Sequence, residues 1–166
     1  MDILKISLFA STFLTGLIAG LFYSYSCSVN LGLSKLSDLE YLKAMKSINK
    51  EILNPWFFLS FMGSFVVVPL TTWLYYQGNG PDASFYLLLG ASIFYVVGVF
   101  GLTVAGNVPL NNSLDRLELG YGTEQEINAK RLAFEIPWNR FHFIRTLANA
   151  VAFAMVALAI VNKFSA

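Results

Sequence analysis

Residues 83–106 read ASFYLLLGASIFYVVGVFGLTVAG and contain no Asp, Glu, Lys or Arg. A helix of about 20 apolar residues crosses the hydrocarbon core of a bilayer, which is about 30 Å thick. Apolar side chains run all round this segment, whereas a helix that lies on a membrane surface carries a single apolar stripe. The stretch therefore predicts a transmembrane helix and decides the fold class of the whole chain.

Three further stretches have the same character. Residues 6–29 and 53–76 also lack charge, and residues 143–161 carry only Arg145, near their start. The chain of 166 residues is 56% hydrophobic and only 13% charged, whereas a soluble domain has about 25% charged residues. We predict an all-α protein, an integral membrane four-helix bundle that forms a single domain over residues 1–166.

The two long loops between spans contain helix-start signals. Ser37-Asp-Leu-Glu40 and Thr123-Glu-Gln-Glu126 are capping boxes, in which the first and last side chains satisfy orphan backbone donors. We therefore expect a short amphipathic helix in each loop. The first helix should end or kink at Asn54-Pro55, and the second should run towards Pro137.

Basic residues predict the orientation of the spans, because loops rich in Lys and Arg face the cytoplasm. The 77–82 connection has no basic residue, whereas both long loops have several. We expect both long loops on the cytoplasmic side and both termini outside. No targeting segment is apparent, which favours an inner or plasma membrane. The basic residues of the long loops are Lys35, Lys43, Lys46, Lys50, Arg116, Lys130, Arg131 and Arg140.

Several function classes are disfavoured by what the sequence contains. The net charge of +1 and the lack of a basic stripe argue against a nucleic-acid partner. Cys27 is the only cysteine, so a cysteine-rich metal site is excluded. A single histidine cannot give bis-His haem ligation. His142 with nearby carboxylates could bind one metal weakly, but the spacing gives that idea no specific support, and we expect no metal site.

Polar side chains at membrane depth are costly, so their positions mark candidate sites. The 107–112 cluster ends the third span, and the 138–145 cluster enters the fourth, on the same side of the membrane. Residues 138, 142, 145 and 149 are spaced i, i+4, i+7 and i+11, which places them on one helix face. The candidate catalytic residues are His142 and Arg145, and the candidate substrate-binding residues are Asn107, Asn111, Asn112, Trp138, Asn149 and Tyr23.

Each of these residues also has a simpler interpretation. Arg145 can extend to lipid headgroups, and a lone interfacial His142 is more often a structural residue than a base. The asparagines can cap the end of the third span, and Tyr23 can be an ordinary packing aromatic. What favours a site is the convergence of imidazole, guanidinium, indole and amides on facing helix ends, which suits a flat, oxygenated aromatic molecule.

The two clusters resemble a known family. Asn107-x-Pro109-x-Asn111, followed by Trp138-x-x-x-His142-x-x-Arg145, is similar to the motifs of the anthrone oxygenase-like membrane family, long catalogued as a domain of unknown function. The resemblance extends over nearly the whole chain. It implies four spans and the oxidation of anthrones to anthraquinones, with dioxygen as co-substrate and without metal or flavin.

If that activity carries over, the resemblance implies a role for each motif residue. His142 would be the base that removes a methylene proton, because only imidazole titrates near neutrality without perturbation. Arg145, Asn107 and Asn111 would stabilise the enolate oxygen. Trp138 would hold the ring system by stacking.

Two other functions fit the same residues. The chain could bind or transport a hydrophobic, quinone-like molecule, although it lacks the internal repeats usual for alternating access. It could also be an accessory structural subunit in contact with membrane lipids, or a homodimer through Gly16-x-x-x-Gly20. A closed aromatic cavity beside His142, large enough for two or more fused rings, would favour chemistry. Solid packing there would favour structure.

Overall fold

A computed structural model describes residues 3–165, and within them the chain forms helices and turns without a strand. This confirms the all-α prediction. The elements in chain order are α1 (Ile3–Ser24), the π-helical turn η1 (Tyr25–Val29), α2 (Asn30–Leu33), α3 (Asp38–Glu51), α4 (Pro55–Asn79), α5 (Ala83–Ile93), the π-helical segments η2 (Phe94–Gly101) and η3 (Thr103–Asn107), α6 (Val108–Arg116) and α7 (Glu124–Ser165).

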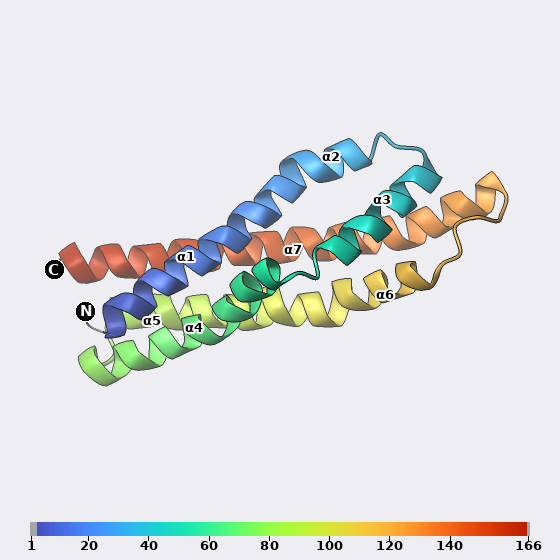
Figure 1. Cartoon of the computed structure of the whole chain (residues 1–166). Helices are drawn as coiled ribbons and strands as arrows, with labels where there is room; N and C mark the ends of the chain where they lie inside the picture. The colour runs from blue at the N-terminus through green and yellow to red at the C-terminus, as the bar shows by residue number, and fades with distance from the viewer. Residues whose placement is uncertain (1–2, 166) are drawn as a thin grey trace.

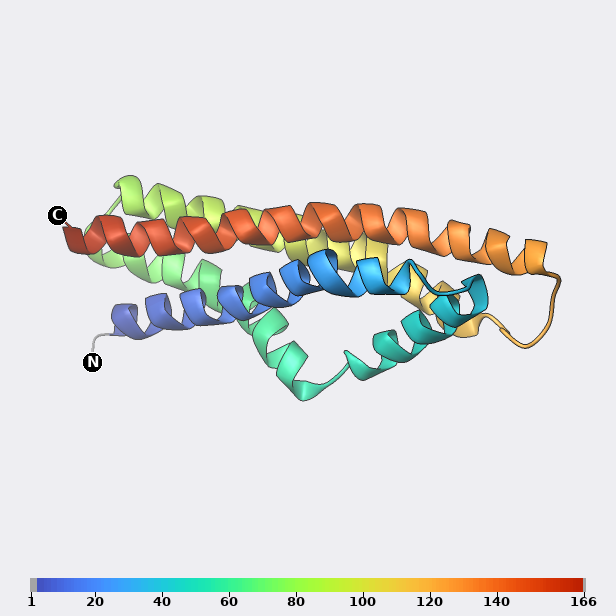
Figure 2. The same ribbon diagram turned by 90° about the horizontal axis from the view of Figure 1, so that it is seen from above.

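Four helical segments are long and apolar enough to cross a membrane: Ile3–Leu33, Pro55–Asn79, Ala83–Arg116 and Glu124–Phe164. The protein is therefore an integral membrane protein with the four predicted spans. Figures 1 and 2 show the segments running side by side. The start of α1, the end of α7 and the α4–α5 turn lie at one end of the molecule, and the α2–α3 and α6–α7 connections lie at the other.

Hydroxyl groups join the spans within their apolar surroundings. The Ser11 and Thr71 hydroxyls are 2.8 Å apart between α1 and α4, and those of Thr72 and Ser92 are 2.8 Å apart between α4 and α5. The Tyr95 hydroxyl donates to the Phe61 carbonyl at 3.0 Å. Such bonds between helices stabilise membrane bundles, because no water is present there to satisfy a polar group.

Local signals set the helix boundaries. The Glu40 carboxylate accepts from the Ser37 backbone N–H at 3.1 Å, as the predicted capping box requires. Asn54 caps α4 by accepting from the Phe57 N–H at 3.0 Å, so α3 ends before Pro55 as expected. Gly80 closes the α4–α5 turn with φ of 75°, a conformation that favours glycine.

The second loop helix differs from expectation. The Thr123 capping box opens α7, but this helix continues through Pro137 to Ser165 as a single element of 42 residues. A proline inside a helix removes one hydrogen bond and usually breaks or kinks the helix. Here the residues on both sides, Phe134 and Trp138, are buried in the same apolar cluster, so packing holds the helix together across the gap.

The length of α7 divides the molecule into two apolar cores. At about 1.5 Å per residue, its 42 residues extend about twice the thickness of a bilayer core. One core lies among the four spans and includes Phe22, Val99 and Ala148. The other packs α3 and α6 against the first half of α7 and includes Met45, Leu114, Phe134 and Trp138.

The surroundings of Gly16 and Gly20 show what the Gly-x-x-x-Gly motif of α1 contacts. A side chain at Gly16 would meet the Phe153 ring at 3.2 Å, so this glycine allows α1 to approach α7 within the bundle. Gly20 faces open space. The homodimer through this motif stays a prediction.

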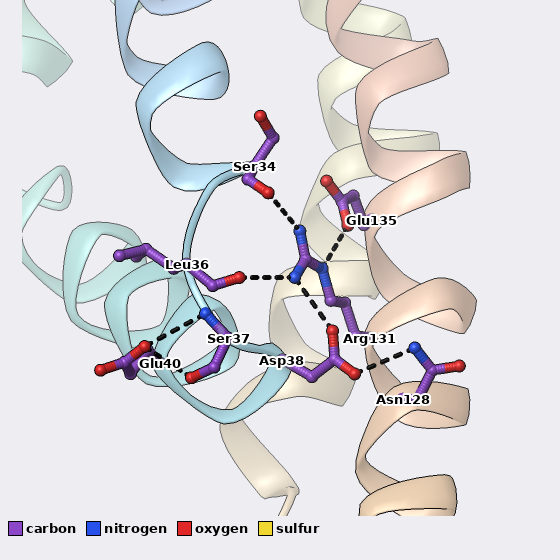
Figure 3. A network of polar contacts seen from close by, with 8 residues as sticks. All are labelled: Ser34, Leu36, Ser37, Asp38, Glu40, Asn128, Arg131 and Glu135. Atoms are coloured by element: carbon purple, nitrogen blue, oxygen red, sulfur yellow. Dashed lines mark hydrogen bonds and ion pairs between the residues drawn. The ribbon is translucent and has the colours of Figure 1, made fainter.

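An arginine joins the α2–α3 turn to α7 (Figure 3). Arg131 bonds the carboxylates of Glu135 at 2.6 Å and Asp38 at 2.9 Å. It also donates to the Leu36 and Ser34 carbonyls and lies over the Tyr41 ring. The Asn128 amide, together with Arg131, holds the pKa of the Asp38 carboxyl below its ordinary value.

We expect Arg131→Met to destabilise the protein. Two carboxylates and two carbonyls would lose a charged donor whose side chain is only 11% exposed, at a cost of about 2 kcal/mol. Thermal unfolding in detergent measures this loss. Arg140→Met, on an exposed position of the same helix, is the control and should leave the melting temperature unchanged. Equal melting temperatures for both variants would contradict the assignment.

Candidate functional site

The candidate site lies where the two cores meet. Trp138 belongs to the core formed by α3, α6 and α7, and Phe22 belongs to the core among the spans. Between them, α7 carries His142 and Arg145, which are 2% and 8% exposed. The polar residues are thus enclosed on both sides by apolar packing.

Arg145 is a buried cation without an anionic partner. Its Nη1 donates to the Thr103 hydroxyl at 3.3 Å and its Nη2 to His142 Nδ1 at 3.2 Å. The guanidinium carbon lies 4.4 Å from the Phe22 ring centre and 5.4 Å from that of Trp138. No Asp or Glu among residues 3–165 forms an ion pair with it, and its Nε has no hydrogen-bond partner. Such a group favours an anion, because burying an unpaired charge is costly.

The contacts of His142 assign its tautomer. Arg145 has only donors, so Nδ1 must accept and Nε2 carries the proton. Nε2 then donates to the Ser26 hydroxyl at 2.9 Å, and that hydroxyl donates to the Phe22 carbonyl at 2.9 Å. The imidazole stacks on Trp138 with ring centres 5.1 Å apart and planes at 15°. His142 is therefore neutral, and its lone-pair nitrogen faces the guanidinium.

Two asparagines of the 107–112 cluster fix the position of Trp138. The indole N–H donates to Asn111 Oδ1 at 2.8 Å. The Asn107 amide donates to the Trp138 carbonyl at 3.2 Å, while its own Oδ1 is buried without a partner. The sequence-predicted meeting of the two clusters is present in the structure.

These groups border a cavity of about 110 Å³. By comparison, an apolar cavity of about 150 Å³ binds benzene. The cavity is aromatic and lies beside His142, but it is smaller than two fused rings, so it does not by itself meet the size expected of a site for a fused-ring substrate. Its lining consists of Leu21, Phe22, Tyr25, Ile48, Asn49, Ile52, Leu53, Phe57, Thr103, Val108, Asn111, Trp138, His142 and Arg145.

Four predicted site residues do not line this cavity, and Asn107 is one of them, although its amide binds the Trp138 carbonyl. Asn149 is fully buried one helical turn beyond Arg145, and both of its amide atoms lack a partner. Tyr23 is 68% exposed on the outside of α1, because its neighbour Phe22 faces inward and consecutive helical residues point about 100° apart. Asn112 is exposed and lines a neighbouring outer pocket instead.

Sequence reasoning missed four contributors. Tyr25 and Ser26 reach the site from η1, a π-helical turn that follows α1, and such turns are frequent at functional sites. Thr103 begins η3 and holds Arg145. Asn49 comes from α3. The only available signal was the presence of uncharged polar residues near the span ends, and nothing in the sequence marks a π-helical turn.

Among residues 3–165, no group of three His, Cys, Asp or Glu side chains is placed to hold a metal ion. Around His142 the hydrogen-bond partners are hydroxyls and a guanidinium. This donor set is suited to orienting the imidazole and to receiving an anion at Arg145.

Comparison with known families gives one match. A family model described as anthrone oxygenase matches residues 56–155, which is more than half of the chain. No curated protein and no solved structure matched. The matched residues include both motifs, Asn107 to Asn111 and Trp138 to Arg145, and they begin after α3. The chain therefore belongs to the anthrone oxygenase family.

We expect Asn111→Leu to destabilise the site and Asn112→Leu to leave it intact. The first change removes the acceptor of the buried Trp138 indole, at a cost of about 1–3 kcal/mol. Asn112 is exposed and its side chain forms no hydrogen bond among residues 3–165. In a Trp56→Phe, Trp73→Phe background, Trp138 is the only tryptophan. Its emission and the melting temperature should change in the first variant alone, and equal effects would contradict the assigned bond.

Proposed function

We propose that the protein oxidises an anthrone-like or quinol-like aromatic with dioxygen and needs no metal or flavin. The observation that carries the proposal is Arg145, a buried guanidinium without an anion beside an aromatic-lined cavity. The family match, which includes this residue, supports the same chemistry.

Arg145 suits the oxygen of the deprotonated substrate. An anthrone has a methylene between two aryl rings and opposite a carbonyl, and loss of a methylene proton places negative charge on that oxygen. The unpartnered Nε of Arg145 offers a charged donor to it. Because Thr103 and the Phe22 face already position the guanidinium, little reorganisation is needed when the charge develops.

His142 is the proposed base. In the structure its Nδ1 accepts from Arg145, and a substrate oxygen that draws the guanidinium towards itself would free Nδ1 for the proton. Ser26 keeps the Nε2 proton in place and so maintains the tautomer. The resulting imidazolium would be balanced by the negative charge of the enolate.

The oxidation balances without a further reactant. The electron-rich enolate passes one electron to dioxygen, and the two radicals combine to form a carbon–oxygen bond. The imidazolium returns its proton to the peroxide, the oxygen–oxygen bond breaks, and the remaining hydrogen leaves the carbon. One oxygen atom becomes the new carbonyl, and the other leaves as water with both methylene hydrogens.

We also infer the placement of the site in the membrane. The loops that flank it carry eight of the eleven basic residues, which supports a cytoplasmic position for this end and an outside position for both termini. An inner or plasma membrane is the proposed location.

We expect Arg145→Met to reduce kcat/KM for emodin anthrone about 100-fold or more, since removal of one oxyanion donor costs 10²–10³ in other enzymes. Oxygen uptake and anthraquinone absorbance measure the rate. Arg140→Met, which changes an exposed arginine of the same helix, should keep the parental rate. The melting temperature shows whether each variant is folded, and full activity in folded Arg145→Met would exclude the proposal.

We expect His142→Ala to lose activity by about 100-fold or more, because a positioned base contributes about 10²–10⁴ in rate. The matched substitution is Ser26→Ala, which removes the nearer of the two hydroxyls that contact Nε2 and should cause a smaller loss. A His142→Ala protein that oxidises emodin anthrone at the parental rate would show that the base lies elsewhere. Ligand binding without turnover in the parental protein would instead support a binding or transport function.

A further inference from the structure

A second pocket of about 210 Å³ adjoins the site cavity. Asn49, Leu53, Val108 and Asn111 line both spaces. The remaining residues around the outer pocket are Lys46, Lys50, Asn112 and Asp115. The outer pocket therefore lies between α3 and α6, and Arg145 lines only the inner cavity.

The α3 side of this outer pocket consists of nitrogen donors. Lys46, Asn49 and Lys50 are spaced i, i+3 and i+4, so they share one helix face. Asn49 Nδ2 is buried and has no partner among the described residues. Lys46 uses one of its three N–H donors on the Leu117 carbonyl at 3.1 Å and keeps the others.

The charges of the outer pocket favour an acidic group. Asp115 is its one carboxylate among the lining residues, and it lies 3.7 Å from Lys50, which offsets it. Lys46 has no carboxylate partner in residues 3–165. The pocket thus has one uncompensated cation and one unpartnered amide donor on the same helix face.

The size of the inner cavity also favours a ligand that extends into the outer pocket. At about 110 Å³ it takes only part of a fused ring system. The outer pocket, at about 210 Å³, brings the combined space to the lower end of the range for ligand pockets, which begins near 300 Å³. A molecule that fills both would keep its reactive oxygen near Arg145 and extend past Asn49 towards Lys46.

We propose that the outer pocket binds a carboxylate substituent of the aromatic substrate, held by Lys46 and Asn49. This inference names the substrate class and rests on the proposed function. Its donors come from α3, which lies outside the residues matched by the family model. On this proposal Asn49 and Lys46 are specificity-determining residues, and Lys46, which lines the outer pocket alone, acts on a part of the substrate remote from the reacting carbon.

Binding of product-like quinones tests the proposal without requiring turnover. The full chain in phosphatidylcholine nanodiscs is titrated with anthraquinone-2-carboxylate and with anthraquinone. The parental protein should bind the carboxylate about tenfold more tightly, as one charged hydrogen bond allows. Lys46→Met and Asn49→Leu should each reduce this preference. Lys46→Met should also leave the affinity for anthraquinone itself within about twofold, because Lys46 does not line the inner cavity.

The control variant is Lys35→Met, because Lys35 is exposed and lines neither pocket; it should keep the parental preference. Equal affinity of the parental protein for both quinones, or a preference that survives both α3 substitutions, would overturn the proposal. The same titrations are then repeated in nanodiscs of phosphatidylglycerol. The preference of the parental protein for anthraquinone-2-carboxylate over anthraquinone should persist there. Its loss would show that the pocket binds lipid phosphate and would overturn the proposal.

The outcomes separate this inference from the proposed function. Oxidation of emodin anthrone with no preference for the carboxylate quinone would overturn the outer-pocket assignment alone. A carboxylate preference that depends on Lys46, in a protein that oxidises no anthrone, would support the pocket and remove the proposed oxidation.

Discussion

The burial of one guanidinium among apolar helices is the constraint on which the site depends. Arg145 has no carboxylate partner among residues 3–165, and its neighbours are the Thr103 hydroxyl, the His142 imidazole and two aromatic faces. Cation–π contacts and neutral hydrogen bonds recover part of the lost hydration. The remainder of the cost is not recovered by any anion among the described residues, and this is the reason for proposing an oxyanion as the ligand at this position.

The two-core architecture maintains this arrangement. Because α7 continues through Pro137, Trp138 in one core and Ala148 in the other are held on a single helix, with His142 and Arg145 between them. The Arg131 contacts fix the α2–α3 turn on the same helix. As a result, α3 is positioned against α6, and the cavity is lined by α3 residues that are far from Arg145 in the sequence.

The sequence predicted the features that depend on local composition and chain topology, and it did not predict those that depend on packing between helices. The four spans could be predicted because a long stretch without charged residues is stable in lipid as an α-helix, in which every backbone polar group is hydrogen-bonded within the segment. The topology predicted that the 107–112 and 138–145 clusters lie on the same membrane side and can meet, but it did not predict the particular bond between Asn111 and Trp138. Tyr25 and Ser26 could not be placed, because the π-helical turn that rotates them inward depends on packing. Asn149 shares the predicted face, yet one turn of depth separates it from the cavity.

The position of the site at the junction of the cores also has a chemical consequence. A fused aromatic partitions into the bilayer, whereas an acidic substituent keeps its hydration only near the membrane surface. The inner cavity lies on the apolar side, and the outer pocket presents Lys46 and Asn49 on the helix that joins the loop region. A substrate with both properties would be oriented by these opposing preferences before it reaches Arg145. Its reactive ring would then enter the cavity first.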